Sequence, residues 1–301
     1  MPSPKVSIII PTHDRPTHLG RAIDSVRNQT YAHWELIIVV DGTPPETYAE
    51  LRQQHQDLPI TWLFQDQAGP GAARQHGLDA ATGSAICFLD DDDYYLPEHL
   101  TRLVPLLTDG SHQIVRAGLV GEKPDGTRER YPLYDNNRPI LPQYWRAPSN
   151  LMAFLFSRTA ARRVPLDTVR TTVEDFTWLV RVLSHYPVQQ SVHYTAVYVL
   201  HEANRSSHAL APNFLQDRLT AAEAAYAYGT VAEQTPRRYL TAWQFKQHLH
   251  YARNLFRLGH RTAGIRALRA GLRYAAFDLT TARQLAYTFA YGLKVWLNPV
   301  R

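Results

Sequence analysis

Residues 85–93 have the sequence Ala85-Ile86-Cys87-Phe88-Leu89-Asp90-Asp91-Asp92-Asp93, an apolar run that ends in four consecutive carboxylates. Such a run, preceded by the turn residues 82–84, is typical of a buried strand in a parallel sheet. The carboxylates then lie at the carboxyl end of the strand, the edge at which open α/β sheets bind ligands. Desolvating adjacent charges is costly unless a cation or hydrogen bonds compensate. Because oxygen ligands select hard ions, the stretch predicts a site for Mg²⁺ or Mn²⁺.

An acidic turn exposed to solvent is the alternative for these carboxylates. In that interpretation Asp93 caps the helix predicted from Pro97, and Glu98 lies in its first turn. The position of the carboxylates directly after a predicted buried strand favours the ligand site.

Strands and helices alternate on the amino-terminal side of this stretch. Apolar and β-branched runs predict strands at 5–10, 34–40 and 60–64, the first of them ended by Pro11. The spacing of apolar residues predicts helices at 19–29 and 46–56. This βαβαβ order is typical of an α/β fold with a parallel sheet and helices on its faces.

A glycine-rich segment, residues 69–78, follows the third predicted strand and opens a helix. Such a helix start lets backbone N–H groups approach a phosphate, and the helix dipole favours negative charge. Arg74 falls in the first turns, where it can pair with a carboxylate of the acidic strand end or with a diphosphate. An ordinary tight turn explains the glycines equally well, so both interpretations stay open.

The chain of 301 residues is 45% apolar, enough for one main domain with an appendage. No stretch reaches the roughly 18 apolar residues of a transmembrane helix, and the amino terminus lacks the pattern of a signal peptide. These features predict a cytoplasmic protein. The single cysteine, Cys87, excludes an internal disulfide.

Basic residues are concentrated near the carboxyl terminus. Twelve Lys or Arg and one acid follow Pro236, so this tail has a net charge of +11, against −6 for the preceding residues and +5 in total. The asymmetry predicts an anionic partner for the tail, either a membrane leaflet or a polyanion. No nucleic-acid-binding module is recognisable, so nucleic acid is not expected as a partner.

Four short motifs stand in the order and spacing of the family 2 glycosyltransferases, which have the GT-A fold. They are residues 6–12, Val39-Val40-Asp41-Gly42-Thr43, residues 71–78, and Phe88-Leu89 with the four aspartates. The chain therefore resembles an inverting, metal-dependent enzyme that uses a nucleotide-sugar donor. The resemblance implies a GT-A catalytic domain with a Rossmann-like, mostly parallel sheet over residues 1–210. Residues 211–301 are expected to form a helical, basic extension.

The resemblance also implies roles for residues at the strand ends. Asp41 accepts a hydrogen bond from the base, typically uracil, although Val40 replaces the first acid of the usual pair. Asp92 is the main ligand of Mn²⁺ or Mg²⁺. The other donor-binding residues are Pro11, Thr12 and His13 for the nucleoside, Arg74 for the diphosphate, and Asp90 and Asp91 for ribose and metal-bound water.

Two further positions carry an implied role. Glu174-Asp175 precedes an apolar run with helical spacing, and the resemblance makes Asp175 the base that deprotonates the acceptor hydroxyl. His201 follows the last predicted strand, and the resemblance places it at the metal or the diphosphate. The alternatives are a pair of helix-capping acids and a histidine that is simply hydrogen-bonded.

The pattern is helical from about Asn213 onward. A turn at 255–260 separates two helices, and Ile265, Leu268 and Leu272 recur at helical spacing with arginines between them. These helices pack on the catalytic domain or lie on an anionic membrane, and the sequence supports both. A predicted irregular loop at 134–149 holds Tyr144 and Trp145, which can stack on a sugar or pack in the core.

The resemblance and these features predict a hexosyltransferase-type enzyme that moves a sugar, from a UDP-sugar in the first place, to a polysaccharide, glycan or lipid-linked acceptor. The expected location is the cytoplasm, with peripheral contact to the inner face of the cell membrane. Two alternatives are a non-catalytic nucleotide- or carbohydrate-binding protein on the same fold and a sugar nucleotidyltransferase. The loop after the first strand, residues 11–15, lacks the glycines that the nucleotidyltransferase needs.

Overall fold

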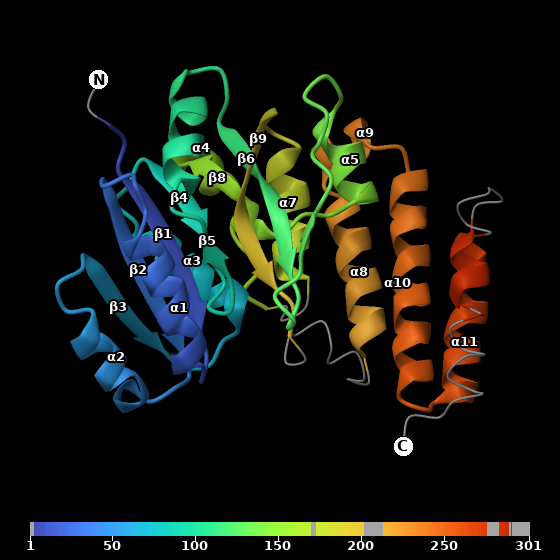
Figure 1. Ribbon diagram of the computed structural model, residues 1–301. Coiled ribbons are helices and arrows are strands. Elements are labelled where there is room, and N and C mark those ends of the chain that lie inside the picture. Colours follow the sequence, from blue (N-terminus) through green and yellow to red (C-terminus); the bar gives the residue numbers. More distant parts are fainter. Residues whose placement is uncertain (1–2, 170–172, 202–212, 276–282, 289, 291–301) are drawn as a thin grey trace. The chain divides into compact units, whose positions relative to one another are not determined.

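The computed structural model describes residues 3–169, 173–201, 213–275, 283–288 and 290 (Figure 1). These residues divide into two compact units. The first comprises the residues up to Tyr144 together with Pro148–His201, and the second comprises Trp145–Ala147 together with the described residues after 212. The boundary expected between residues 210 and 211 lies outside the described residues, so a division into domains at that point stays a prediction.

One sheet forms the centre of the first unit. Within the described residues it has nine strands, in the order β3-β2-β1-β4-β8-β6-β9-β5 with β7 paired to β6. The strands are β1 (Val6–Thr12), β2 (Trp34–Asp41), β3 (Ile60–Gln65), β4 (Ala85–Phe88), β5 (Tyr94–Tyr95), β6 (Ile114–Glu122), β7 (Arg128–Arg130), β8 (Phe154–Ser157) and β9 (Val188–Val199). Only the short strands β5, β7 and β8 run against the common direction among those described. The predicted mostly parallel sheet is confirmed.

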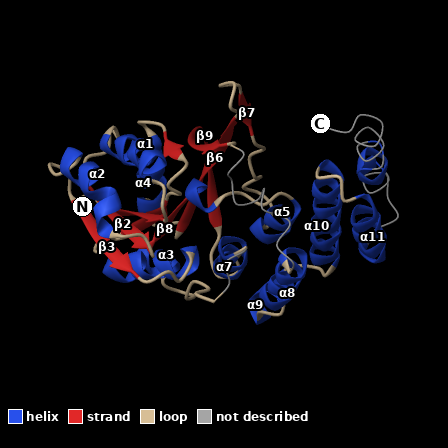
Figure 2. Cartoon of the chain, turned by 90° about the horizontal axis from the view of Figure 1, so that it is seen from below, coloured by secondary structure: helices blue, strands red, loops and turns tan. Residues whose placement is uncertain are grey.

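Helices cover both faces of this sheet, as predicted from the alternating pattern. Figure 2 shows α1 and α4 on one face and α3 and α7 on the other. The helices are α1 (Pro16–Arg27), α2 (Ala49–Gln54), α3 (Pro70–Ala80), α4 (His99–Thr108), α5 (Ile140–Arg146), α6 (Arg158–Ala161) and α7 (Glu174–Leu183), with 3₁₀ turns η1 (Pro45–Tyr48) and η2 (Leu151–Ala153). Gly77 lets α3 approach β1, because a Cβ there would lie 2.5 Å from Ile9 Cγ2.

The strand directions bring the expected site residues to one edge. β1 is parallel to β2 and β4, and β6 is parallel to β9. Because β8 is antiparallel to both β4 and β6, those two strands also share a direction. The carboxyl ends of β1, β2, β4 and β9 therefore lie at the same edge of the sheet.

Pro11 does not end the first strand, contrary to the sequence-based prediction. β1 continues to Thr12, and Pro11 pairs with Val39 of β2. The pairing with β4 stops earlier, at Ile9 and Phe88. Pro11 therefore lies on a part of β1 that is paired on one side only, where a missing N–H breaks no ladder.

The region 134–149 differs from the irregular loop that was expected, because it contains helix α5. Tyr144 and Trp145 are both buried, with 1% of each exposed. The Tyr144 ring stacks on Phe176 with a centroid distance of 5.6 Å, and the Trp145 ring meets Trp243 edge-on at 6.2 Å. Both rings therefore pack in cores, and neither is available to stack on a sugar.

The second unit is helical. Its helices are α8 (Phe214–Tyr226), α9 (Gly229–Gln234), α10 (Arg238–Arg257) and α11 (Arg261–Gly271), followed by the 3₁₀ turn η4 (Leu272–Tyr274). α10 and α11 form an antiparallel hairpin around a small core that includes Phe256 and Leu268 (Figure 1). Gly264 permits this approach, because a Cβ there would lie 2.5 Å from the Phe256 ring. The predicted pair of helices is confirmed, and no helix among the described residues is long and apolar enough to cross a membrane.

The apolar face expected on α11 is only partly correct. Leu268 is buried, but Ile265 is 45% exposed and Leu272 is 47% exposed. The residues that face α10 are Gly264, Ala267, Leu268 and Gly271. Their small side chains allow close packing, which leaves Ile265 and Leu272 outside the core.

Candidate active site at the carboxyl edge of the sheet

The four consecutive aspartates form a buried turn after β4. The backbone N–H of Asp93 donates to the carbonyl of Asp90 at 3.1 Å. Asp91, Asp92 and Asp93 are less than 10% exposed, whereas the side chain of Asp90 is 36% exposed. A solvated acidic turn is therefore excluded, and four carboxyl groups lie close together at the sheet edge.

Asp91 is held by the end of the neighbouring strand. Thr12 Oγ1, at the end of β1, donates to Asp91 Oδ2 at 2.8 Å. Burial, followed by the charge of Asp92, raises the pKa of Asp91 to about 7. Asp91 therefore takes up a proton close to neutral pH, unlike an exposed aspartate.

Asp92 and His201 meet, although 108 residues separate them in the sequence. His201 Nε2 lies 3.0 Å from Asp92 Oδ2, and Arg15 Nη1 lies 2.9 Å from the same oxygen. Arg21 donates to the backbone carbonyl of Asp92. The two residues predicted to bind a metal are thus brought together by β4 and β9. Arg15 is a member of the site that the sequence interpretation missed, and its position in the loop after β1 was the available signal.

Asp93 does not cap a helix. α4 begins at His99, and its N-cap residue Glu98 makes no side-chain capping bond. Instead, Asp93 Oδ1 accepts a hydrogen bond of 2.8 Å from the N–H of Val199 in β9. Burial, followed by the charge of Asp90, raises the pKa of Asp93. The fourth aspartate therefore ties β4 to β9, the two strands that carry Asp92 and His201.

Arg74 bridges two carboxylates that come from distant parts of the chain. Its Nη2 lies 2.6 Å from Asp90 Oδ1, and its Nη1 lies 3.0 Å from Glu174 Oε1. Arg74 and Glu174 are both 4% exposed. Burial opposes the charge of Arg74, but Asp90, Glu174 and Asp175 outweigh it and raise the pKa. The bridge joins the acidic turn to the first residues of α7, and Glu174 is a second residue that the sequence interpretation missed.

Asp175 lies beside this bridge in the first turn of α7. Its Oδ1 accepts a hydrogen bond of 2.7 Å from the N–H of Phe176, and its side chain is partly exposed. The N-cap of α7 is Val173, which has a left-handed φ of 57° and no side-chain capping bond. The acidic pair is therefore not the N-cap, and its charge favours the helix dipole from inside the first turn.

Asp41 organises the loop that leads into α3. Its Oδ1 accepts from Gln65 Nε2 at 2.9 Å and from the N–H of Ala68 at 2.8 Å, and its Oδ2 accepts from the N–H of Gly69 at 2.8 Å. Gly69 has a φ of +89°, which a glycine adopts without strain. The expected contact of Asp41 with a base stays a prediction, beside this observed role at the start of α3.

The three residues expected at the nucleoside lie around the end of β1. Pro11 and Thr12 are buried in the strand, and His13 is exposed directly after it. His13 Nδ1 donates to the carbonyl of Asp41, which joins the ends of β1 and β2. His13 is therefore the one of the three whose side chain is open to a ligand.

The side chains present fit a divalent cation that also takes ligands from a bound donor. Among the described residues no group of three or more His, Cys, Asp or Glu is arranged to hold a metal ion. Asp92 Oδ2 and His201 Nε2, however, lie 3.0 Å apart at the acidic turn. Mg²⁺ sites commonly use one or two protein ligands and complete their coordination with substrate phosphates and water.

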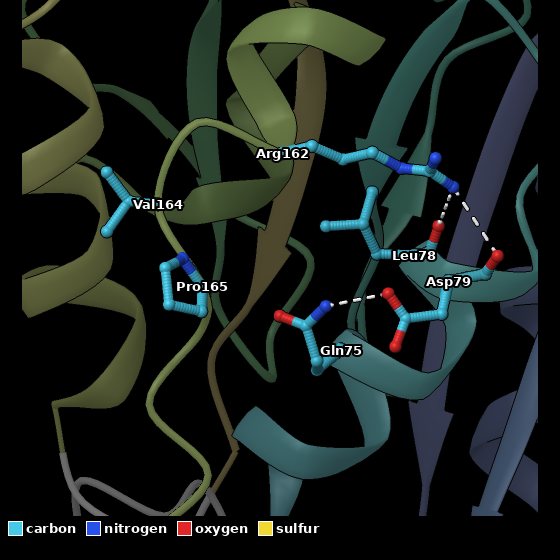
Figure 3. Close-up of a pocket in the computed structure, with 6 residues that line it drawn as sticks. All are labelled: Gln75, Leu78, Asp79, Arg162, Val164 and Pro165. Atoms are coloured by element: carbon cyan, nitrogen blue, oxygen red, sulfur yellow. Dashed lines mark hydrogen bonds between the residues drawn. The ribbon is translucent and has the colours of Figure 1, made fainter.

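A separate hollow of about 300 Å³ lies beside the second half of α3 (Figure 3). Its lining residues are Gln75, Leu78, Asp79, Arg162, Val164 and Pro165. Arg162 Nη2 donates to the carbonyls of Leu78 and Asp79, and Gln75 Nε2 donates to Asp79 Oδ1. These polar groups satisfy one another and include none of the expected site residues, so the hollow is distinct from the candidate active site.

Solved structures of GT-A glycosyltransferases share this fold. TarS of S. aureus in complex with UDP-GlcNAc superposes with a TM-score of 0.66 at 16% identity, covering 96% of this chain and 88% of that chain. The mannosyltransferase PcManGT of Pyrobaculum calidifontis, in complex with GDP-Man and Mn²⁺, gives 0.60 at 18% identity, covering 97% and 83%.

Sequence relatives match over about a third of this chain. A protein of Campylobacter jejuni named GalNAc(5)-diNAcBac-PP-undecaprenol beta-1,3-glucosyltransferase is 34% identical over 110 residues, 36% of each chain. An uncharacterised glycosyltransferase of Nostoc sp. is 38% identical over 102 residues, 33% of this chain and 32% of that protein. The matched region spans about a third of each relative. The family model described as Glycosyl transferase family 2 matches residues 7–169, more than half of the chain. The chain belongs to glycosyl transferase family 2.

Proposed function

We propose that the protein is an inverting glycosyltransferase that transfers a sugar from a nucleotide-diphosphate donor, in the first place a UDP-sugar, to a polysaccharide, glycan or lipid-linked acceptor. The observation that carries the proposal is the Arg74 bridge. It joins Asp90 of the acidic turn to Glu174 of α7, at 2.6 and 3.0 Å. A donor-binding edge and a candidate base are thereby held in one rigid arrangement.

The donor half of the site is the edge formed by β1, β2 and β4. His13 and Asp41 receive the nucleoside together with Pro11 and Thr12, and Asp90 and Asp91 receive the ribose and metal-bound water. Solved relatives of this fold are complexes with UDP-GlcNAc and with GDP-Man. Those complexes support a nucleotide-diphosphate sugar as the donor class.

Asp92 and His201 are the residues that hold Mn²⁺ or Mg²⁺ in this proposal. Asp92 Oδ2 and His201 Nε2 lie 3.0 Å apart, close enough that one cation would contact both. A bound divalent cation supplies positive charge against the diphosphate that leaves the sugar. Arg15, 2.9 Å from Asp92, adds a guanidinium at the same place.

Asp175 is the proposed base. It removes the proton from an acceptor hydroxyl as that oxygen attacks the anomeric carbon, and the bond from this carbon to the diphosphate oxygen breaks. Attack opposite the leaving group inverts the configuration. Arg74 acts as a positioning residue, because both of its terminal nitrogens bind protein carboxylates.

The test is an assay of nucleotide release with UDP-, GDP- and dTDP-sugars, with Mn²⁺ and with short-chain lipid-linked saccharides as acceptors. We expect nucleotide release from donors of one nucleotide class only, and we expect EDTA to abolish it. NMR of the product should show an inverted anomeric configuration. Nucleotide binding without release from any donor would instead identify a binding protein. Peripheral contact of the basic helices with an anionic membrane at the cytoplasmic face is part of the same proposal.

A further inference from the structure

Helix α11 carries an exposed face that combines arginines with aliphatic side chains. Ile265 is 45% exposed and Leu272, the residue directly after α11, is 47% exposed. They stand seven positions apart, which places them on the same side of the helix. Leu258, at the tip of the hairpin before α11, is 46% exposed. Large aliphatic side chains are concentrated here, on an element that is otherwise polar outside its core.

Three arginines of α11 and Arg273 of the following turn η4 lie next to these aliphatic residues. Arg261, Arg266, Arg269 and Arg273 are all exposed, and the last three follow a helical spacing of three and four. Residues 258–275 contain no Asp or Glu. Within the part of the chain that the structure describes, none of the four forms an ion pair with a carboxylate; Arg273 instead lies over the Tyr274 ring at 4.7 Å.

The buried side of α11 is already used by the hairpin. Gly264, Ala267, Leu268 and Gly271 face the small core formed with α10. The exposed side is therefore not required for packing of the hairpin. Ile265, Leu272 and four arginines without a carboxylate partner among the described residues are therefore available to a partner outside the hairpin.

We infer that the exposed face of α11, defined by Ile265, Leu272 and the four arginines, docks on an anionic lipid bilayer. An amphipathic helix with aliphatic residues and arginines lies in the interface plane, with the aliphatic side chains among the acyl chains and the guanidinium groups at the headgroups. Each basic residue near an anionic leaflet contributes about 1 kcal/mol. The inference rests on the membrane contact of the proposed function and extends it by naming the surface that makes the contact.

A second copy of the chain is a poorer occupant for this face. A symmetric pairing would bring the arginines of one copy against those of the other, and such like-charge contacts are unfavourable. Nucleic acid would engage the arginines, but it offers no apolar region to the aliphatic pair. The bilayer is the partner that satisfies both components of the face.

The experiment is co-sedimentation of the full-length protein with vesicles of phosphatidylcholine alone and of phosphatidylcholine mixed equally with phosphatidylglycerol. The wild-type protein is expected to bind the mixed vesicles, with an affinity that decreases as salt increases, and to bind the neutral vesicles weakly. Arg266→Gln with Arg269→Gln should weaken binding about thirtyfold, and Ile265→Ser with Leu272→Ser roughly tenfold.

Matched control variants come from exposed positions of the first unit. Val169→Ser with Val192→Ser removes aliphatic side chains that are 87% and 72% exposed, and Arg102→Gln with Arg163→Gln removes two exposed charges. Both control pairs should bind vesicles as the wild-type protein does. Circular dichroism and nucleotide binding should be unchanged in all variants, which separates this inference from the proposed function.

Three outcomes would overturn the inference. The first is equal binding of the wild-type protein to neutral and anionic vesicles, or binding to neither. The second is an equal loss of affinity in the control variants and the α11 variants. The third is salt-sensitive binding to single-stranded RNA without vesicle binding, which would make the face a polyanion site.

Discussion

The acidic edge of the first unit and helix α11 of the second unit both gather charge, but in opposite ways. At the edge, Arg74 is 4% exposed and lies between two carboxylates at 2.6 and 3.0 Å. On α11 the arginines are exposed, and no carboxylate among the described residues pairs with them. Buried, paired charges fix the positions of the site residues before a ligand binds. Exposed charges without a protein partner are available to bind a partner of opposite charge.

The largest effect is expected at Asp175. Asp175→Asn should lower the rate of sugar transfer by roughly 10²–10⁴-fold, because the amide cannot accept the proton of the acceptor hydroxyl. Nucleotide binding and the unfolding midpoint should stay at wild-type values. Asp109→Asn, at an exposed carboxylate after α4, serves as the control. A transfer rate unchanged in Asp175→Asn would remove this residue from the mechanism.

The Arg74 bridge can be compared directly with an exposed pair of the second unit. Arg74→Met leaves Glu174 buried without its partner and should lower the free energy of unfolding by about 3–5 kcal/mol. Arg237 pairs with Glu223 at 3.2 Å, and its side chain is 66% exposed. Arg237→Met should lower the free energy of unfolding by only about 0–1 kcal/mol.

The double variant Arg74→Met with Glu174→Gln should recover part of the loss, because the uncompensated charge is removed. Urea unfolding of each variant gives these free energies. Equal losses for the Arg74 and Arg237 variants would contradict the distinction between buried and exposed charge.

The close packing around the bridge should be sensitive to one methyl group. A Cβ at Gly71, in the first turn of α3, would lie 1.9 Å from the carbonyl oxygen of Asp167 and 3.4 Å from Glu174 Cγ. Gly71→Ala should therefore destabilise the protein by about 2–3 kcal/mol and reduce nucleotide binding. Gly229→Ala in α9, where a Cβ would meet nothing within 4 Å, should change stability by less than about 0.5 kcal/mol. Chemical unfolding curves that coincide for the two variants would show that the packing at Gly71 adapts freely.

A smaller effect concerns pH. His99 is fully buried, stacks on Tyr95 at a centroid distance of 3.9 Å, and its Nδ1 lies 2.8 Å from Thr195 Oγ1. Burial lowers the pKa of His99 from 6.5 to about 3. The unfolded chain therefore binds a proton below pH 6.5 that the folded protein does not, so stability present above that pH is lost on acidification.

His99→Gln should remove this part of the pH dependence. Between pH 8 and pH 5, protonation of His99 in the unfolded chain lowers the free energy of unfolding of the wild-type protein by about 2 kcal/mol. The decrease over the same pH range should be about 2 kcal/mol smaller in the variant. Unfolding free energies at both values of pH measure the difference. The same loss in both proteins would show that His99 is protonated in the folded state.

The sequence predicted the sheet and the position of the site because both depend on local patterns. Apolar runs marked the parallel strands, and strand direction then placed Asp41, Asp92 and His201 at one edge. The Arg74 bridge to Glu174 was not predictable, because it joins residues 100 positions apart through side-chain geometry. Arg15 was visible as a basic residue in the loop after β1, but its partner among the four aspartates depends on how the turn folds.

Two other differences have local causes. Helix α5 was missed because prolines at 139 and 142 indicated an irregular loop, although proline is tolerated in the first turn of a helix. On α11, periodicity showed which residues share a side but not which side packs on α10, so the exposure of Ile265 and Leu272 was not predictable.

The measurement that tests the central claim most directly is calorimetric titration of UDP, GDP and dTDP into the full-length protein, with Mn²⁺ and then with EDTA, repeated on Asp92→Ala. One nucleotide should bind in the presence of Mn²⁺, and its binding should be lost with EDTA and in the variant. If folded wild-type protein binds none of the three, or if Asp92→Ala binds as tightly as the wild-type protein, the acidic edge is not the donor site.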